Sequence, residues 1–184
     1  MTKVFIIHGS QGSPKGNWFP WLKEQLESLE CKVFSPQFPA QNQNLNDWLK
    51  EFSKIEQELD KNSIMVGHSL GPAFIMNVLQ KRNSLIKSAF FVAGFTQLLG
   101  NATYDPLNKS FVEKGFDWKK IKQNCKKFYL FQSSNDPYVP LKEAQLLAKN
   151  LGEKLIIVEK AGHFMKSDGF ARFELLLDEI KKEL

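Results

Sequence analysis

A chain of 184 residues, 42% of them hydrophobic and 24% charged, has the composition of one globular domain covering residues 1–184. No apolar run approaches the roughly 20 residues that a bilayer requires, and the N-terminus lacks the pattern of a secretory signal, so we expect a cytoplasmic protein without membrane contact. The two cysteines have no metal-ligand spacing, so we expect free thiols in a reducing compartment and no metal site.

The net charge of +5 would suit nucleic acid only if it were concentrated on one surface. The one basic cluster lies in residues 117–127, where lysines alternate with Trp118, Ile121 and Cys125 at helical spacing. This pattern favours an amphipathic surface helix over a face that binds nucleic acid. We therefore expect no nucleic-acid partner.

Short apolar runs and helical patterns alternate along the chain. The first half predicts a strand over 4–7, a helix over 18–29, a strand over 32–35, a helix from Asp47 to Leu59 capped by Asn46, a strand over 63–66 and a helix through 73–79. The second half predicts strands over 87–93 and 127–131, a helix over 141–151, a strand over 155–158 and a helix from Phe170 to the C-terminus. Residues 94–116 form an excursion without a clear period.

The expected strands are nearly continuous apolar runs, as in sheets that helices cover on both faces. Alternation of strands and helices with crossovers of this length predicts a mainly parallel sheet of about six strands with right-handed connections. The expected fold class is therefore α/β with three layers. Residues 94–116 are too few to form a large lid.

Polar side chains follow four of the expected strands. HGSQGS comes after the first strand, GHSLG after the third, QSSNDPYVP after the fifth and EKAGHF after the sixth. Ligands of such sheets bind outside the carboxyl ends of the strands. The sequence therefore predicts a site built from four separate loops at one end of the sheet.

GHSLG places Ser69 between a strand and a helix. A nucleophilic serine at such a turn needs small neighbours, because strand and helix approach closely, and Gly67 and Gly71 supply them. The plain alternative is that Ser69 is only the N-cap of the helix. A serine hydroxyl is a weak nucleophile without a base, so its partners decide between the two interpretations.

Of the three histidines, only His163 follows both Ser69 and a later strand. A carboxylate must fix the tautomer of that histidine, and Asp136 after the fifth strand gives the order Ser, Asp, His known for such turns. We predict Ser69, Asp136 and His163 as the catalytic residues. The alternatives are an Asp136 that only initiates a turn and an exposed loop histidine. Asp168 is the rival acid, and we expect it to cap the last helix.

Two other histidines and a set of backbone donors complete the predicted site. We expect His68 to point away from the nucleophile and to be structural. We expect His8 to shape the first loop, with a direct substrate contact as the alternative. The oxyanion needs two backbone N–H donors. Leu70, after the nucleophile, supplies the first, and Ser10 or Gln11 supplies the second; the sequence leaves these two open, because a backbone donor has no side-chain signature.

The sequence resembles the small α/β-hydrolases of the YdeN-like and retinoblastoma-binding-protein-9 type in five blocks: HGSQGSPKGNWFPWLKEQL, GHSLG, AGFTQLLG, SSNDPYVP and AGHF. The resemblance runs from about Val4 to the final helix. It implies that Ser69, Asp136 and His163 form the triad and that the fold is short, without a large lid domain. It also implies serine hydrolase activity of a kind whose natural substrates are poorly defined.

We predict cleavage of a small carboxylic ester, the expected acyl substrate, through an acyl-enzyme on Ser69 without a metal or organic cofactor. Phe95, Leu98 and Leu99 are expected to wall the substrate pocket, with His8 as a further candidate. Two other functions stay open. One is a binding module on a hydrolase scaffold with little activity, and the other is thioesterase or transacylase chemistry at the same serine. No protein partner is indicated.

Overall fold

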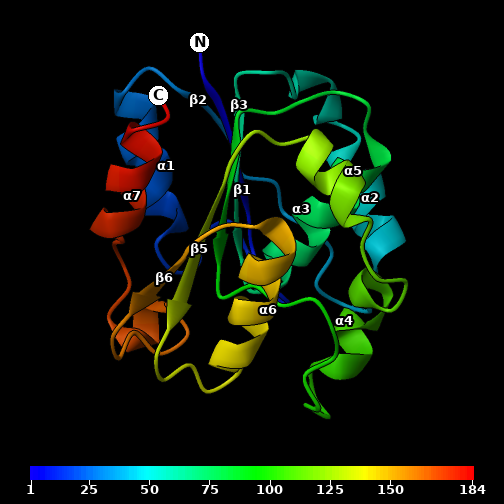
Figure 1. Ribbon diagram of the computed structural model, residues 1–184. Coiled ribbons are helices and arrows are strands. Elements are labelled where there is room, and N and C mark those ends of the chain that lie inside the picture. The colour runs from blue at the N-terminus through cyan, green and yellow to red at the C-terminus, as the bar shows by residue number, and fades with distance from the viewer.

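The computed structural model describes residues 1–184 and contains one six-stranded sheet (Figure 1). The strands are β1 (Lys3–Ile7), β2 (Lys32–Phe34), β3 (Ser63–His68), β4 (Ser88–Val92), β5 (Phe128–Ser133) and β6 (Leu155–Val158). They lie in the order β2-β1-β3-β4-β5-β6, and every neighbouring pair is parallel. The predicted number and direction of strands are therefore confirmed.

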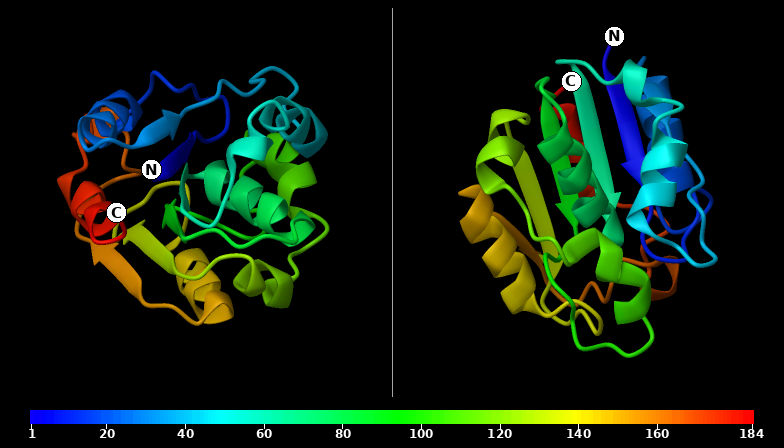
Figure 2. Two further views of the ribbon diagram at one scale, coloured as in Figure 1. Left: turned by 90° about the horizontal axis from the view of Figure 1, so that it is seen from above. Right: turned by 90° about the vertical axis from the view of Figure 1, so that its right-hand side faces the viewer.

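Helices cover both faces of this sheet. They are α1 (Phe19–Ser28), α2 (Leu45–Phe52), α3 (Leu70–Lys81), α4 (Asp105–Val112), α5 (Trp118–Gln123), α6 (Leu141–Leu151) and α7 (Glu174–Lys181), with 3-10 turns at Glu56–Glu58 and Lys166–Asp168. Seen from above, α1 and α7 lie on one side of the sheet and the other helices on the opposite side (Figure 2). Two buried clusters, of 29 and 20 residues, fill the two interfaces. The three-layer α/β class is confirmed.

The inner strands β1, β3, β4 and β5 are mainly apolar because each of their faces meets a helix layer. In β1, Phe5 and Ile7 belong to the cluster that packs against α2 to α6, whereas Val4 and Ile6 belong to the cluster that packs against α1 and α7. Successive side chains of a strand point to opposite faces, so burial on both sides leaves no polar alternation.

Two helices begin elsewhere than predicted. α2 begins at Leu45 because Asn44, not Asn46, is its N-cap, and the Asn44 side chain accepts the N–H of Asp47 at 3.0 Å. The helix ends at Phe52, and the rest of the predicted segment holds only the 3-10 turn. The last helix begins at Glu174 rather than at 170. The ends of an element are what a sequence pattern defines least sharply.

Residues 94–116 contain the helix α4, which periodicity did not detect. Its buried face is made of Asn108, Phe111 and Val112, so a polar residue interrupts the apolar stripe. The helix packs on α3, where the side-chain amide of Asn77 donates to the carbonyl of Phe111 at 2.8 Å. α4 brings residues to the candidate site that the sequence had not indicated.

The lysine-rich segment forms α5 and the turn after it. Ile121 and Cys125 are buried, whereas Lys119, Lys122 and Lys126 are exposed. The predicted amphipathic surface helix is therefore confirmed, although it ends at Gln123. No helix of the chain combines the length and the apolar character needed to cross a membrane.

Candidate active site

The candidate site lies where the order of the sheet reverses. The chain passes from β1 outward to β2 and then from β3 toward β6 in the other direction, so the carboxyl ends of β1 and β3 flank the switch point. Open α/β sheets bind ligands in the crevice at such a point. A cavity of about 340 Å³ is lined there by Ser10 from the loop after β1, by Ser69 from the turn after β3 and by His163 from the loop after β6.

Ser69 occupies a strained turn between β3 and α3. Its φ of 58° and ψ of −105° lie outside the regions that residues with a Cβ normally adopt. Holding such a residue costs on the order of 1–3 kcal/mol. Its N–H donates to the carbonyl of Val92 at 2.9 Å, which ties the turn to β4. Ser69 occupies the N-cap position of α3, as the plain alternative expected, but its side chain accepts no helix N–H and so does not cap the helix.

The two glycines of GHSLG stand where backbones approach too closely for a side chain. A Cβ on Gly67 would lie 2.7 Å from the carbonyl carbon of Gly71. A Cβ on Gly71 would lie 2.6 Å from the carbonyl oxygen of Ile7. This packing of strand, turn and helix is the one that a nucleophile elbow requires.

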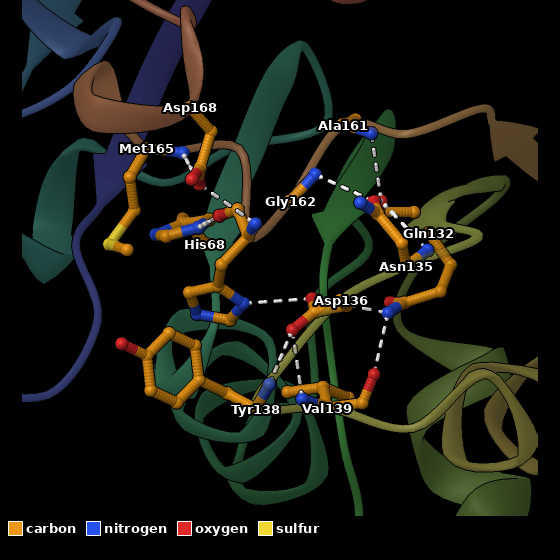
Figure 3. A network of polar contacts seen from close by, with 12 residues as sticks. His68, Gln132, Asn135, Asp136, Tyr138, Val139, Ala161, Gly162, Met165 and Asp168 are labelled. Carbon is orange, nitrogen blue, oxygen red and sulfur yellow. Dashed lines mark hydrogen bonds and ion pairs between the residues drawn. The ribbon is translucent and has the colours of Figure 1, made fainter.

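His163 and Asp136 form a buried pair, and Figure 3 shows the contacts of Asp136 as dashed lines. Asp136 Oδ2 lies 2.8 Å from His163 Nδ1, and their side chains are 1% and 7% exposed. Asp136 Oδ1 accepts the backbone N–H groups of Tyr138 and Val139 at 2.8 and 3.0 Å, and Oδ2 also accepts from Gln132 Nε2 at 3.2 Å. Asp136 therefore initiates the turn and binds His163 as well. A carboxylate held this way places the proton of the neutral ring on Nδ1.

The backbone of His163 is held on both sides, by Asp168 and by His68, which Figure 3 labels. Asp168 Oδ2 accepts the N–H of His163 at 2.9 Å, and His68 Nε2 donates to the His163 carbonyl at 2.8 Å. With Nδ1 bound to Asp136, Nε2 is the one polar atom of His163 that has no partner in the protein. His163 lines the cavity together with Ser69, so this nitrogen is available to a ligand there.

His68 and Asp168 both hold this backbone. The sequence predicted a structural role for His68 but a different one for Asp168. Burial, followed by the neighbouring His163 ring 4.8 Å away, lowers the pKa of His68 to about 3, so the ring is neutral and donates through Nε2. His68 also lines the cavity. The prediction that Asp168 caps the last helix is wrong, because α7 begins at Glu174 and Asp168 binds the N–H of Met165 in addition to that of His163.

The loops after β5 and β6 are joined by a clamp of four consecutive residues on each side. Side-chain oxygens at the end of β5 and in the loop after it accept backbone N–H groups of the loop after β6 at 3.0 Å, in the pairs Ser133 with Ala161, Ser134 with Lys160, and Asn135 with Gly162. Asp136 with the ring of His163 is the fourth pair (Figure 3). The clamp presets the distance between the acid and the histidine. Its one signal in the sequence is the run of short polar residues SSND.

Of the two N–H groups that the sequence left open in the loop after β1, one has no partner in the protein. The N–H of Gln11 donates to the side-chain oxygen of Gln43 at 2.9 Å, whereas the N–H of Ser10 has no hydrogen-bond partner in the protein. Leu70 is the first residue of α3, so its N–H has no helical carbonyl one turn earlier to bind. Of the two first-loop residues that the sequence left open, Ser10 has the available donor.

The geometry agrees with the comparisons to known proteins. The serine hydrolase family model matches residues 4–182. The chain belongs to the serine hydrolase family. YdeN of Bacillus subtilis (strain 168) is 34% identical over 184 residues, which cover 97% of this chain and 94% of YdeN. Serine hydrolase RBBP9 of Rattus norvegicus is 28% identical over 177 residues, which cover 91% of this chain and 89% of that protein.

Solved structures place this serine hydrolase among the α/β-hydrolases. The crystal structure of the ydeN gene product of B. subtilis matches with a TM-score of 0.93 at 29% identity, over 100% of this chain and 98% of that chain. Est1E from Butyrivibrio proteoclasticus has a TM-score of 0.75 at 15% identity, over 99% of this chain and 88% of its own, and shares the fold. The resemblance stated from the five sequence blocks is confirmed.

His8 does not line the cavity of this serine hydrolase. It is buried, its Nε2 accepts the N–H of Phe38 at 3.1 Å, and its Nδ1 therefore carries the proton and donates to the carbonyl of Gly9 at 2.8 Å. Burial lowers the pKa of His8, which keeps the ring neutral. The expectation that His8 shapes the first loop is therefore confirmed, whereas the alternative, a place in the substrate pocket, is wrong.

The walls of the cavity come mostly from residues that the sequence did not single out. Phe95 and Leu99 line it as expected, but Leu98 is 42% exposed and lies outside it, so its assignment to the pocket is wrong. The lining residues missed by sequence reasoning include Asn17, Asn101, Tyr104, Asn108, Tyr138 and Met165. No Asp, Glu, Lys or Arg lines the cavity. Three of the missed residues belong to α4 or the turn before it, which had not been predicted.

Proposed function

We propose that this serine hydrolase cleaves small carboxylic esters through an acyl-enzyme on Ser69, with His163 as general base and Asp136 as the carboxylate that orients His163. The observation that carries the proposal is the state of the His163 ring. Nδ1 is bound to Asp136, the backbone is held on both sides, and Nε2 alone is left free in the cavity that Ser69 also lines. A ring fixed in this way can take one proton, at Nε2.

The chemistry follows from these positions. Ser69 Oγ forms a bond to the acyl carbon while its proton moves to His163 Nε2 and the carbonyl π electrons move onto the oxygen. Asp136 stabilises the imidazolium through Nδ1–H. Collapse of the intermediate breaks the bond to the leaving oxygen, which takes the Nε2 proton and departs as the alcohol. Water then attacks the acyl-enzyme in the same way and releases the carboxylic acid and the Ser69 hydroxyl.

The backbone N–H groups of Ser10 and Leu70 are proposed as the two donors to the oxyanion. The N–H of Gln11 is excluded from this role as long as it is bound to Gln43. Leu70 opens the 12-residue helix α3, whose N-terminal dipole favours the negative charge that develops beside Ser69. Loss of one such donor in other hydrolases lowers kcat by about 100- to 1000-fold.

The strain at Ser69 favours catalysis over the alternative of a binding module. A φ of 58° at a residue with a side chain lowers stability, and a protein that only holds a partner does not need a serine in that conformation. Thioesterase or transacylase chemistry would use the same residues. These reactions differ from ester hydrolysis in the leaving group or in the acceptor, so substrate profiling distinguishes them.

Labelling with a fluorophosphonate, alongside hydrolysis of p-nitrophenyl esters of graded chain length, tests the proposal. We expect labelling of the wild type, loss of label and activity in Ser69→Ala, and faster hydrolysis of short than of long acyl chains, because the cavity holds only about 340 Å³. Ser13→Ala is the matched control, since Ser13 lines the same cavity and should be dispensable for labelling. Label that persists in Ser69→Ala, or none on folded wild type, would refute the assignment. A higher kcat/KM for acyl thioesters would assign a thioesterase.

A further inference from the structure

Asn108 of α4 is a buried amide at the wall of the cavity. It is 4% exposed and lines the cavity together with Ser10 and Ser69. Its Oδ1 accepts the hydroxyl of Ser10 at 2.5 Å and the side-chain amide of Gln43 at 3.4 Å. A buried side-chain amide carries two N–H donors and one oxygen acceptor, and each of these needs a hydrogen-bond partner.

Backbone groups decide which way the Asn108 amide faces. The N–H of Gln11 can only donate, so the Gln43 atom at 2.9 Å from it is Oε1. The carbonyl of Leu107 can only accept, so the Gln43 atom at 3.3 Å from it is Nε2. Because Gln43 then presents Nε2 to Asn108, the Asn108 atom that faces it is Oδ1. A flipped Asn108 would place two amide donors against each other.

Asn108 Nδ2 is therefore directed away from Gln43 and Ser10. Nδ2 makes no hydrogen bond in the protein, but part of its surface is accessible to solvent. Since the residue is almost entirely buried and lines the cavity, the surface open to Nδ2 is that of the cavity. This donor is fixed in direction and has no acceptor.

We propose that Asn108 Nδ2 donates a hydrogen bond to an uncharged oxygen, an ether, hydroxyl or keto oxygen, in the acyl group of the substrate. The inference rests on the proposed function of Ser69. The alcohol takes its proton from His163 Nε2 and therefore departs on the His163 side of the cavity. Tyr138 belongs to that side, since the centroids of its ring and of the His163 ring are 5.0 Å apart. Asn108 instead contacts Ser10, in the loop proposed to bind the oxyanion, where the acyl group stays attached to the enzyme.

The chemistry of the other walls defines the class of acyl group. No charged side chain lines the cavity, so a carboxylate or an ammonium group on the substrate would lose its hydration without an ion partner. Phe95 and Leu99 line the same cavity and supply apolar surface there. A short, neutral acyl chain with one oxygen acceptor satisfies both walls, whereas a plain alkyl chain leaves the buried donor of Asn108 unpaired.

Two esters that differ by one atom test this inference: p-nitrophenyl methoxyacetate and p-nitrophenyl butyrate, in which an ether oxygen replaces one methylene group. The quantity measured is the ratio of their kcat/KM values, divided by the ratio of their rate constants with hydroxide, which removes their difference in intrinsic reactivity. For the wild type we expect this corrected ratio to exceed one by about 2- to 12-fold, the range of one hydrogen bond between neutral groups. Asn108→Asp keeps the acceptor for Ser10 and Gln43 but removes the donor, and should bring the ratio to one or below.

Asn101→Asp is the matched control, because it introduces the same charge into the same cavity. Asn101 Oδ1 accepts the N–H groups of Thr103 and Tyr104, and an aspartate keeps both bonds. A corrected ratio of one in the wild type, a ratio unchanged by Asn108→Asp, or an equal change in Asn101→Asp would overturn the inference. So would a dependence on Asn108 seen only when the ether oxygen is moved to the alcohol part, in 2-methoxyethyl and butyl acetates.

The outcomes also separate this inference from the proposed function. If the wild type hydrolyses butyrate but shows no preference for the ether, the inference alone fails. If it hydrolyses neither ester and Ser69 takes no fluorophosphonate, both fail. If Asn108→Asp does not fold, as judged by thermal melting, the corrected ratio of the wild type still decides.

Discussion

The buried neutral histidine His68, in the wall of the candidate site, makes the stability of the fold depend on pH. Burial, followed by the adjacent His163 ring, lowers the pKa of His68 to about 3 in the folded protein, from an ordinary value of 6.5. Below pH 6.5 the unfolded chain binds a proton at this residue and the folded chain does not, until the pH approaches 3. Stability is therefore full above pH 6.5 and is lost as the pH falls through this window.

The size of the effect follows from the two pKa values. Between pH 7 and pH 5 the free energy of unfolding should fall by about 2 kcal/mol through His68 alone, since one unit of difference corresponds to about 1.4 kcal/mol. For a chain of this length the thermal midpoint should fall by roughly 4 to 8 °C. Urea unfolding followed by circular dichroism at pH 7, 6 and 5 measures the change directly.

The variant His68→Gln isolates the contribution of this residue. Its side-chain amide can donate to the His163 carbonyl in place of Nε2, but it does not titrate. We expect the variant to lose about 2 kcal/mol of the pH dependence and to keep the smaller part that His8 contributes in the same direction, because burial also lowers the pKa of His8. An equal slope in wild type and variant would refute the assignment of a neutral His68.

Three further predictions concern the first loop, the turn at Ser69 and the clamp. Gln43→Leu frees the first loop and should lower kcat on p-nitrophenyl butyrate by about tenfold with little change in KM; an unchanged kcat would contradict this. Gly71→Ala places a Cβ 2.6 Å from the carbonyl of Ile7, and should destabilise by about 1–3 kcal/mol in urea unfolding; an unaltered midpoint would argue against that contact. Asn135→Ala removes one bond of the clamp and should lower kcat about 10- to 100-fold, because His163 can then move. Asn135→Asp keeps the acceptor and should restore most of the rate. Equal rates in the two variants would exclude a positioning role for Asn135.

The class of fold and the turn at Ser69 could be predicted because their signals are local. A strand buried on both faces is apolar at most positions, and the turn in GHSLG needs small residues at 67 and 71 whatever surrounds it. The parallel sheet then carries the loops with Asp136 and His163 to the same end, as their place after β5 and β6 had suggested. These inferences use neighbours in the chain and the general rules of α/β connections.

What the chain order left open was decided by contacts between distant segments. Gln43 takes the N–H of Gln11, which singles out Ser10, although 32 residues separate the two partners. Asp168 binds the backbone of His163, although its place in the chain suggested a helix cap. Asn108 lines the cavity from α4, a helix too short and too polar on its buried face for periodicity to show. Periodicity records which face of an element is buried, but the partner of a polar group depends on how the loops pack, and only the folded chain specifies that.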